Sequence, residues 1–399
     1  MLRPGQVVAL CAFALLCVGV LMVNSADLMV ARVDSGRDHS PELTLWGIVE
    51  SRAATYLALA CAALVLGALL PVRVVAERMR RLVTHRNALP FLGLAVLLVI
   101  AFCALVYAPG VRDPRNGAHR WIALPGMRDL SMQPSEVAKW ALVPLVAMYC
   151  TLRSRELPRF FTGLMPAMIG VGAVAGFIVI EDLGTGVLVA SVACLVLLAG
   201  GAKFLQFAIF GLIGTGGVSA AILTSPYRMN RVKSFLDPYA HPEGIGYHTI
   251  QGLIAIYNGG GVGRGLGEGI QKRGYLPEVR TDYIMALVCE EGGIAGAAAV
   301  MALIGGLVVA GVVIAKRERD TFLQLWALGI TATVALQASM NLLVVTGMAP
   351  AKGIALPLVS YGGTGWILTA FSLGLLVSIN RTQAEPQEAQ EHVPAGLPA

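Results

Sequence analysis

The sequence predicts an all-α, polytopic membrane protein with about ten transmembrane helices. Hydrophobic residues make up 56% of the 399 positions and charged residues only 14%, and the mean hydropathy is +0.71. A soluble chain of this length needs more charge to cover its surface. The apolar residues also gather in runs of about 20, the length that an α-helix needs to cross the hydrocarbon layer. These observations exclude an ordinary soluble protein.

Ten predicted spans follow from these runs. In chain order they cover 6–24, 54–71, 89–109, 136–152, 161–180, 184–201, 204–224, 283–315, 321–347 and 355–380. The first follows Arg3 and also resembles a signal peptide cleaved near Asn24-Ser25-Ala26, which would leave nine spans. The fourth opens at Pro134-Ser135, a typical helix start. The eighth is long enough to tilt, kink or project beyond the bilayer.

The positive charges of the short connections predict the orientation. Lys and Arg accumulate on the cytoplasmic side of a membrane protein. The clusters are Arg73, Arg78, Arg80, Arg81 and Arg86 in one connection, Arg153, Arg155 and Arg159 in a second, and Lys316, Arg317 and Arg319 in a third. With ten crossings these clusters share one side with both termini, so we expect both termini in the cytoplasm. Several loops on the opposite side are also basic, which this rule does not predict.

The chain is expected to form a single membrane domain over 1–380. It includes a large extracytoplasmic connection at about 225–281, between spans seven and eight, and is followed by a disordered cytoplasmic tail over 381–399. All seven cysteines lie in apolar segments and no Cys-x-x-Cys pair occurs. The pattern therefore indicates neither a disulfide framework nor a zinc site.

An ionisable residue stands at the start of the eighth span. Asp282 belongs to Arg280-Thr281-Asp282-Tyr283 and precedes a long apolar run that soon carries Glu290-Glu291. An ionisable group at the mouth of a membrane helix is costly to hold, so it indicates a functional site. A carboxylate at this place can act as a general base.

Further polar residues gather near the fourth span. Glu136 and Lys139 lie three apart on one helical face, which predicts either a structural ion pair or a polar strip facing a cavity. Arg120, followed by Trp121, is either a functional cation or an anchor at the membrane interface. Asp182 is expected to cap the helix that follows it rather than to act in catalysis.

The 225–281 connection is strongly basic and includes Arg264 and Lys272. Its apolar stretch 250–257 is too short to span, so we expect it to be interfacial or re-entrant. The glycine-rich stretch 259–267 can let backbone N–H groups approach an anion. It lacks the spacing Gly-x-Gly-x-x-Gly and follows no strand, so nucleotide binding is not supported.

Prolines and glycines cluster over 350–365, before the tenth span. They predict a broken or re-entrant backbone, which is tolerated at membrane depth only when it is buried in protein or faces a watery cavity. A helix-packing role for these glycines is the alternative. Lys352 adds another cation on the side expected for Asp282.

Seven motifs occur in order between about residues 110 and 380. They are Gly-Ala-His-Arg-Trp-Ile, Gln-Pro-Ser-Glu-x-x-Lys, Asp-Leu-Gly-Thr, Phe-Leu-Asp-Pro, Tyr-Leu-Pro-Glu-x-x-Thr-Asp, Glu-Glu-x-Gly and Leu-Pro-x-Val-Ser-Tyr-Gly-Gly. Any one of them is weak evidence. Together, on a background of ten spans, they resemble the SEDS family (shape, elongation, division and sporulation) of membrane-embedded peptidoglycan polymerases.

The resemblance implies a bacterial enzyme that joins lipid II units, disaccharide pentapeptides on undecaprenyl diphosphate, into glycan strands outside the cytoplasmic membrane. The essential acid of the family matches Asp282. The departing diphosphate requires positive charge nearby. The expected substrate-binding residues are Arg120, Glu136, Lys139, Lys352, Ser360, Arg264 and Lys272.

Within the family the chain is more similar to the FtsW branch, which serves septal synthesis in cell division. The similarity lies in Gln271-Lys272, Tyr275-Leu276-Pro277-Glu278 and Ala351-Lys352-Gly353. A role in elongation, as in the RodA branch, is the alternative. Three residues depart from the family pattern: Arg280 replaces a usual His, Glu181 replaces a usual Pro, and Gly274 stands where some members have an acid.

Two other functions are compatible with these residues. A flippase that moves lipid II across the bilayer also needs polar groups inside a bundle, but it requires a polar path from side to side. A non-catalytic division scaffold does not require the acid at position 282. The implied partners are lipid II, a class B penicillin-binding protein with transpeptidase activity, and divisome or elongasome proteins, and no nucleic acid. No cofactor and no metal site are evident, although a diphosphate can recruit a divalent cation.

Overall fold

The computed structural model describes residues 2–35, 44–108, 112–115, 118–124 and 127–383. Within them, ten long helices match the ten predicted spans one for one. They are α1 (Pro4–Ser35), α3 (Arg52–Leu69), α5 (Ala88–Ala104), α6 (Pro134–Leu152), α7 (Met165–Glu181), α8 (Leu183–Ala199), α9 (Phe207–Leu223), α12 (Ile284–Arg317), α13 (Thr321–Val345) and α14 (Thr364–Gln383). The predicted fold class is confirmed. Most of the predicted tail, 384–399, lies outside the described residues.

Shorter elements connect these helices. They are α2 (Leu45–Val49), α4 (Val72–Leu82), α10 (Pro226–Leu236), α11 (Tyr247–Gly259), the 3₁₀ turns η1 (Leu105–Tyr107), η3 (Phe204–Gln206) and η4 (Pro238–Ala240), and the π-helical turn η2 (Phe160–Leu164). Seven of the helical segments are long and apolar enough to cross a membrane by length and composition alone. Helix α8 is also apolar but shorter.

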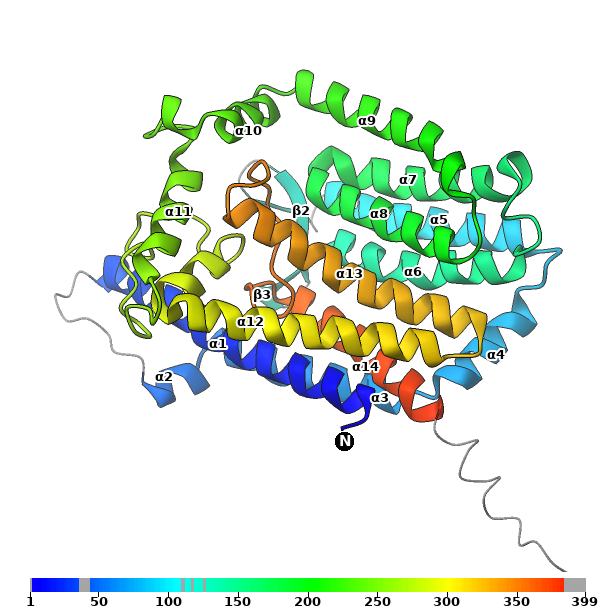
Figure 1. The fold of residues 1–399 in the computed structure, drawn as a ribbon, viewed down its shortest axis with the longest axis horizontal. Helices are drawn as coiled ribbons and strands as arrows, with labels where there is room; N and C mark the ends of the chain where they lie inside the picture. The colour runs from blue at the N-terminus through cyan, green and yellow to red at the C-terminus, as the bar shows by residue number, and fades with distance from the viewer. Residues whose placement is uncertain (1, 36–43, 109–111, 116–117, 125–126, 384–399) are drawn as a thin grey trace, which may run out of the picture.

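The long helices form one bundle (Figure 1). Helix α12 packs between α1 and α13, and α14 packs against α3 and α1. The α3–α14 contact is very close, since a Cβ atom added at Gly374 would lie 2.2 Å from the carbonyl oxygen of Leu64. Lipid tails are as apolar as the helices, so close packing through small residues, rather than the hydrophobic effect, drives such contacts. The largest fully buried side chains include Trp366 and Phe322.

A small antiparallel sheet, which the sequence analysis did not predict, lies in the segment before α6. Its strands are β1 (Arg112–Arg115), β2 (Ala118–Leu124) and β3 (Met127–Met132), in the order β1-β2-β3. Ile122 pairs with Arg112 on one side and with Met132 on the other. The strands are short and follow one another without a long apolar run, so no strong pattern in the sequence indicates them. The sheet gives Arg120 a defined place.

Helix α9 stands apart from the rest of the bundle (Figure 1). None of its residues is buried, and its main neighbours are η3 and α10. The chain then returns through α10 and η4 to α11, which packs along α12. The apolar stretch 250–257 therefore belongs to a 13-residue helix held against a long span.

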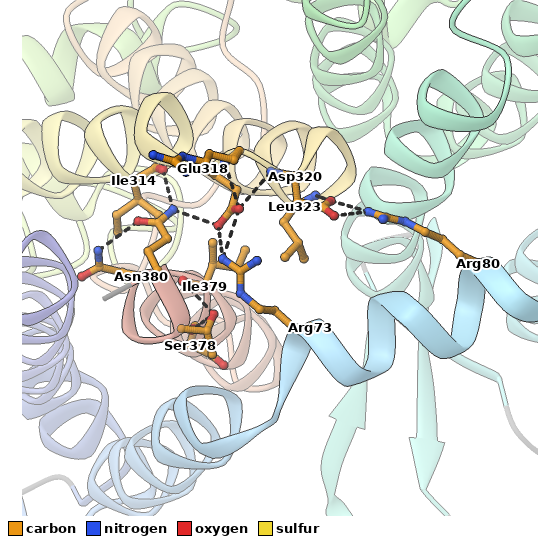
Figure 2. A network of polar contacts seen from close by, with 12 residues as sticks. Arg73, Arg80, Ile314, Glu318, Asp320, Leu323, Ser378, Ile379 and Asn380 are labelled. Atoms are coloured by element: carbon orange, nitrogen blue, oxygen red, sulfur yellow. Dashed lines mark hydrogen bonds and ion pairs between the residues drawn. The ribbon is translucent and has the colours of Figure 1, made fainter. Parts of the chain in front are cut away.

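At the end of the bundle where α12 ends and α13 begins, ion pairs join α4 to the turn between these two helices (Figure 2). Arg73 lies 3.0 Å from Glu318, and Arg80 pairs with Asp320. Glu318 is buried and also accepts hydrogen bonds from the Gln383 side chain and from the backbone of Arg319 and Asp320. Through these donors, the buried Glu318 carboxylate holds α4, α12, α13 and α14 together at this end of the bundle.

Candidate active site

Asp282 lies where the long connection meets α12. Its backbone N–H donates to the Glu278 carbonyl, 3.1 Å away, and its own carbonyl oxygen accepts a hydrogen bond from Asn341 of α13 at 2.8 Å. A Cβ atom added at Gly353 would lie only 3.2 Å from Oδ2 of Asp282. The glycine therefore lets this carboxylate lie directly against the segment that joins α13 to α14.

The segment that joins α13 to α14, residues 346–363, is not helical. The tenth predicted span began at residue 355, whereas α14 begins at Thr364, because Pro357 and the Gly362-Gly363 pair interrupt the backbone. Residues 356–360 are buried in protein, as broken backbone at membrane depth requires.

Hydrogen bonds fix this segment from several sides. The carbonyl oxygens of Ile354 and Ala355 accept from Asn341 and Gln337 at 2.7 and 2.8 Å. The Ser360 hydroxyl accepts from the backbone N–H of Leu356 at 2.7 Å. The Ser360 side chain therefore forms a hydrogen bond within its own segment. The structure gives it a positioning contact, and substrate binding by Ser360 remains a hypothesis.

The electrostatic surroundings of Asp282 are unusual for a carboxylate. The pKa of Asp282 is raised from 3.8 to about 7, and removal from water is the largest cause. The Glu278 and Asp182 carboxylates also raise this pKa, whereas the Arg231 and Arg120 guanidinium groups lower it. A carboxyl group that titrates near neutral pH can accept and release a proton under physiological conditions.

Lys352 lies on the same side of the molecule as this cluster. Burial lowers the pKa of Lys352, the Asp182 carboxylate opposes that change, and the Arg231 guanidinium adds to it. Lys352 and Asp282 therefore share Asp182 and Arg231 as charged neighbours. The structure brings the predicted base and this predicted cation into one site.

Arg120 reaches the same site from strand β2. Its Nε donates to the carbonyl oxygen of Glu181 at 2.9 Å, at the C-terminus of α7. The next residue, Asp182, caps α8 by accepting from the backbone N–H and the hydroxyl of Thr185 at 3.1 and 2.7 Å. The predicted capping role of Asp182 is confirmed, and this capped turn holds Arg120 near Asp282.

Glu136 and Lys139 form the ion pair that their spacing predicted, at 2.7 Å. Lys139 is buried and also donates to the Gln337 side chain at 2.9 Å. Gln337 in turn holds the carbonyl oxygen of Ala355. The pair is thus part of a polar chain that runs from α6 through α13 to the segment containing Lys352. Substrate binding by Glu136 and Lys139 remains a hypothesis.

Lys272 has a different environment from the other predicted cations. Its Nζ lies 2.7 Å from Glu291 and 2.7 Å from the Ser25 hydroxyl, and all three side chains are buried. The backbone N–H groups of Gly267 and Gly269 also donate to the Glu291 carboxylate. The anion held by this glycine-rich region is therefore the carboxylate of the chain itself. A buried, paired lysine is poorly placed to meet a diphosphate.

Arg264 is exposed in the glycine-rich stretch, and its backbone N–H donates to the Glu290 carbonyl. Within the part of the chain that the structure describes, Arg264 is not among the charged neighbours of Asp282. Among the residues that the structure describes, no three His, Cys, Asp or Glu side chains are grouped to hold a metal ion.

Comparison with known proteins decides the family. The profile of the cell cycle proteins FtsW, RodA and SpoVE matches residues 6–385. The chain belongs to this family. The predicted resemblance to the SEDS polymerases is thereby confirmed.

Relatives in this FtsW/RodA/SpoVE family are similar over most of the chain. The probable peptidoglycan glycosyltransferase FtsW of Geobacter metallireducens is 34% identical over 379 residues, which cover 95% of each chain. The same enzyme of Geobacter sp. M18 is 38% identical over 73% of this chain and 77% of its own. Stage V sporulation protein E of Bacillus subtilis is 37% identical over 72% of this chain and 78% of its own.

Two solved structures share the fold. A chain of a peptidoglycan synthase complex that coordinates polymerization and crosslinking has a TM-score of 0.63 and 24% identity, with 92% of this chain and 97% of that chain covered. The rod shape determining protein RodA of Thermus thermophilus has a TM-score of 0.56 and 22% identity, with 95% and 97% covered.

The three residues that depart from the FtsW/RodA/SpoVE family pattern have structural explanations in this chain. Arg280 pairs with Asp27 in the C-terminal third of α1, at 2.7 Å. The Glu181 carboxylate accepts from the Tyr107 hydroxyl at 2.7 Å and from the backbone of His119 at 3.0 Å, which fixes the strand that carries Arg120. Gly274 has a φ of +91°, a conformation that side-chain-bearing residues rarely adopt.

Several residues of the site in this family member carry only a weak signal in the sequence. Gln337 and Asn341 were not selected, although two polar residues four apart in an apolar span lie on one helical face and usually turn away from lipid. Arg231 stands in the long basic connection without a motif of its own, and Glu278 is conspicuous only as part of Tyr275-Leu276-Pro277-Glu278. No local pattern indicates which residues of so long a connection fold back towards Asp282.

Asn341→Ala is expected to destabilise the protein by about 1–3 kcal/mol, because the buried carbonyl oxygens of Asp282 and Ile354 would lose their shared donor. The free energy of unfolding in detergent measures this effect. Ser339→Ala on the same helix is the matched control, because Ser339 is exposed and bonds only to its own helix. Equal stability of the two variants would show that Asn341 does not hold the segment.

Proposed function

We propose that the protein is a peptidoglycan glycosyltransferase that polymerises lipid II into glycan strands outside the cytoplasmic membrane. The observation that carries the proposal is the place of Asp282, whose carboxylate lies directly against Gly353, the neighbour of Lys352. Asp282 also has Arg231 and Arg120 among its charged neighbours, and removal from water is the main cause that raises its pKa. Membership of a family whose relatives are named as probable peptidoglycan glycosyltransferases supports it.

In the proposed reaction, a hydroxyl oxygen of the acceptor sugar attacks the anomeric carbon of the donor sugar. Asp282 accepts the proton of that hydroxyl as general base. The bond between the anomeric carbon and the lipid diphosphate breaks, and its electron pair leaves with the diphosphate oxygen. Lys352, Arg120 and Arg231 stabilise the negative charge that develops there, because fixed cations in a site with little water act strongly on such a charge. A divalent cation brought by the substrate would supply further positive charge.

The protein is further proposed to be a multi-pass protein of the bacterial cytoplasmic membrane, with both termini in the cytoplasm and Asp282 facing outside. Ten helices return the chain to the side on which it began. The arginine-rich helix α4 and the basic turn after α12 lie at one end of the bundle, and positive charges favour the cytoplasmic side. Asp282 precedes α12 and therefore belongs to the opposite end.

Septal synthesis in cell division is the proposed role. The motif similarity to the FtsW branch and relatives named FtsW at 34–38% identity support it. A class B penicillin-binding protein is the proposed partner within the divisome. The likeness to a chain of a peptidoglycan synthase complex supports such a partner.

The proposed activity is tested with the purified full chain, fluorescent lipid II and the cognate transpeptidase. Gel separation of the products should show glycan strands, and more of them when the transpeptidase is present. Translocation of lipid II across vesicle membranes without any strand formation would instead identify a flippase and reject the proposal. Localisation of the protein at the side wall rather than at midcell would reject the septal role alone.

The rate of polymerisation is expected to depend on pH through Asp282. A general base must be ionised, so kcat/KM should fall about tenfold per pH unit below pH 7 and level off above it. Initial rates of lipid II consumption between pH 5 and pH 8 measure this acidic limb of the pH–rate profile.

Two variants check that the limb belongs to Asp282. Glu278→Gln removes a charge that raises the pKa of Asp282 and should move the limb to lower pH. Arg231→Gln removes a charge that lowers this pKa and should move the limb to higher pH. A limb that stays in place in both variants would assign the titration to another group.

A further inference from the structure

Helix α4 occupies a constrained place at the end of the bundle away from Asp282. It begins three residues after α3 ends at Leu69, and α5 begins six residues after it at Ala88. Both neighbours are candidate membrane spans. An 11-residue helix between two spans cannot cross the bilayer itself. It must therefore lie at the membrane surface.

One face of α4 is fixed to the protein. Val72 and Ala76 are buried against the bundle. Arg73 and Arg80 pair with Glu318 and Asp320 in the turn after α12 (Figure 2). These contacts set the rotation of the helix about its axis, so they also decide which residues point away from the bundle.

The outer face of α4 combines apolar side chains with free cations. Val75 is 36% exposed and Leu82 is 70% exposed. Arg78 lies one helical turn from both of them, and Arg81 lies one turn after Arg78. Both arginines are exposed, and neither forms an ion pair with any residue that the structure describes. Cations set among exposed apolar residues are typical of helices at the boundary between lipid headgroups and acyl chains.

We propose that α4 is a binding surface for anionic phospholipid headgroups. Arg78 and Arg81 contact the lipid phosphates, since a guanidinium group presents paired N–H donors that match phosphate oxygens. Val75 and Leu82 enter the upper acyl region. The occupant is a lipid rather than a protein segment because the adjoining spans hold this mixed face in the membrane interface, where lipid headgroups are its immediate neighbours.

Native mass spectrometry of the full-length protein in detergent micelles tests this surface. The probe is dioleoylphosphatidylglycerol, with dioleoylphosphatidylcholine as the zwitterionic lipid. Each arginine near an anionic surface contributes about fivefold to binding. The double variant Arg78→Gln, Arg81→Gln should therefore bind the anionic lipid at its tightest site about 25-fold more weakly. Its binding of phosphatidylcholine should not change.

A matched variant and a conservative variant complete the test. Arg273→Gln removes one exposed charge in the 225–281 connection, far from α4 along the bundle, and should bind phosphatidylglycerol like the unmodified protein. Arg78→Lys with Arg81→Lys keeps both charges and should retain most of the binding, which also separates charge from folding. Unchanged phosphatidylglycerol binding in the double Gln variant would overturn the proposal. An equal loss in Arg273→Gln would also overturn it, because the effect would then be one of net charge alone.

Discussion

Replacing Asp282 by Asn is expected to lower the rate of glycan strand extension by about 10²–10⁴-fold, the usual contribution of a general base. Asn matches Asp in size but cannot take up the proton of the attacking hydroxyl. The hydrogen bonds of position 282 to Glu278 and Asn341 use backbone atoms, so the substitution leaves them intact. Strand formation from lipid II by the purified variant measures the effect.

Folding and membrane insertion should survive this substitution, which separates a catalytic role from a structural one. The melting temperature of Asp282→Asn in detergent should equal that of the unmodified protein or exceed it, because a costly buried charge is removed. Asp27→Asn is the matched control. It removes a carboxylate at the same end of the bundle that only pairs with Arg280 at a half-exposed position, and such pairs contribute about 0–1 kcal/mol. Strand extension at the normal rate by Asp282→Ala would exclude the general-base role.

The spans could be predicted from sequence because of the membrane itself. A helix that crosses lipid must satisfy its backbone hydrogen bonds internally and present apolar side chains over about 20 residues. Each span therefore leaves its own local signal. Strands β1, β2 and β3 leave no local signal of comparable strength in the sequence. Their backbone N–H and C=O groups pair between strands, so no single strand needs a long apolar run. The delayed start of α14 at Thr364 is a related case, in which Pro357 and two glycines overrode an apolar run.

The site was only partly predictable for a similar reason. Asp282 can be recognised from the sequence because an ionisable residue at the start of a membrane helix is energetically costly. The Glu136–Lys139 pair can be recognised because its members lie three residues apart on one helix. The partners of Lys272 cannot be found in that way, because Ser25 lies 247 positions before it and Glu291 lies 19 positions after it, and the three side chains meet only in the folded bundle. Lys352 and Lys272 are equally conspicuous in the sequence, yet Lys352 shares charged neighbours with Asp282, whereas Lys272 is paired with Glu291 inside the protein.

The buried Lys272–Glu291 pair leads to the largest expected loss of stability. Glu291→Ala would leave the Lys272 ammonium group buried with only the Ser25 hydroxyl as a partner. It would also leave the N–H groups of Gly267 and Gly269 without their acceptor. Removing one partner of a buried ion pair typically costs about 3–5 kcal/mol. The free energy of unfolding in detergent should fall by about this amount.

The double variant Glu291→Gln, Lys272→Met removes both charges and keeps one acceptor for the glycines, so it should recover most of the lost stability. Glu268→Gln, in the same loop but exposed, should have almost no effect. If Glu291→Ala were as stable as Glu268→Gln, the ion pair would not be what anchors the glycine-rich stretch to α12.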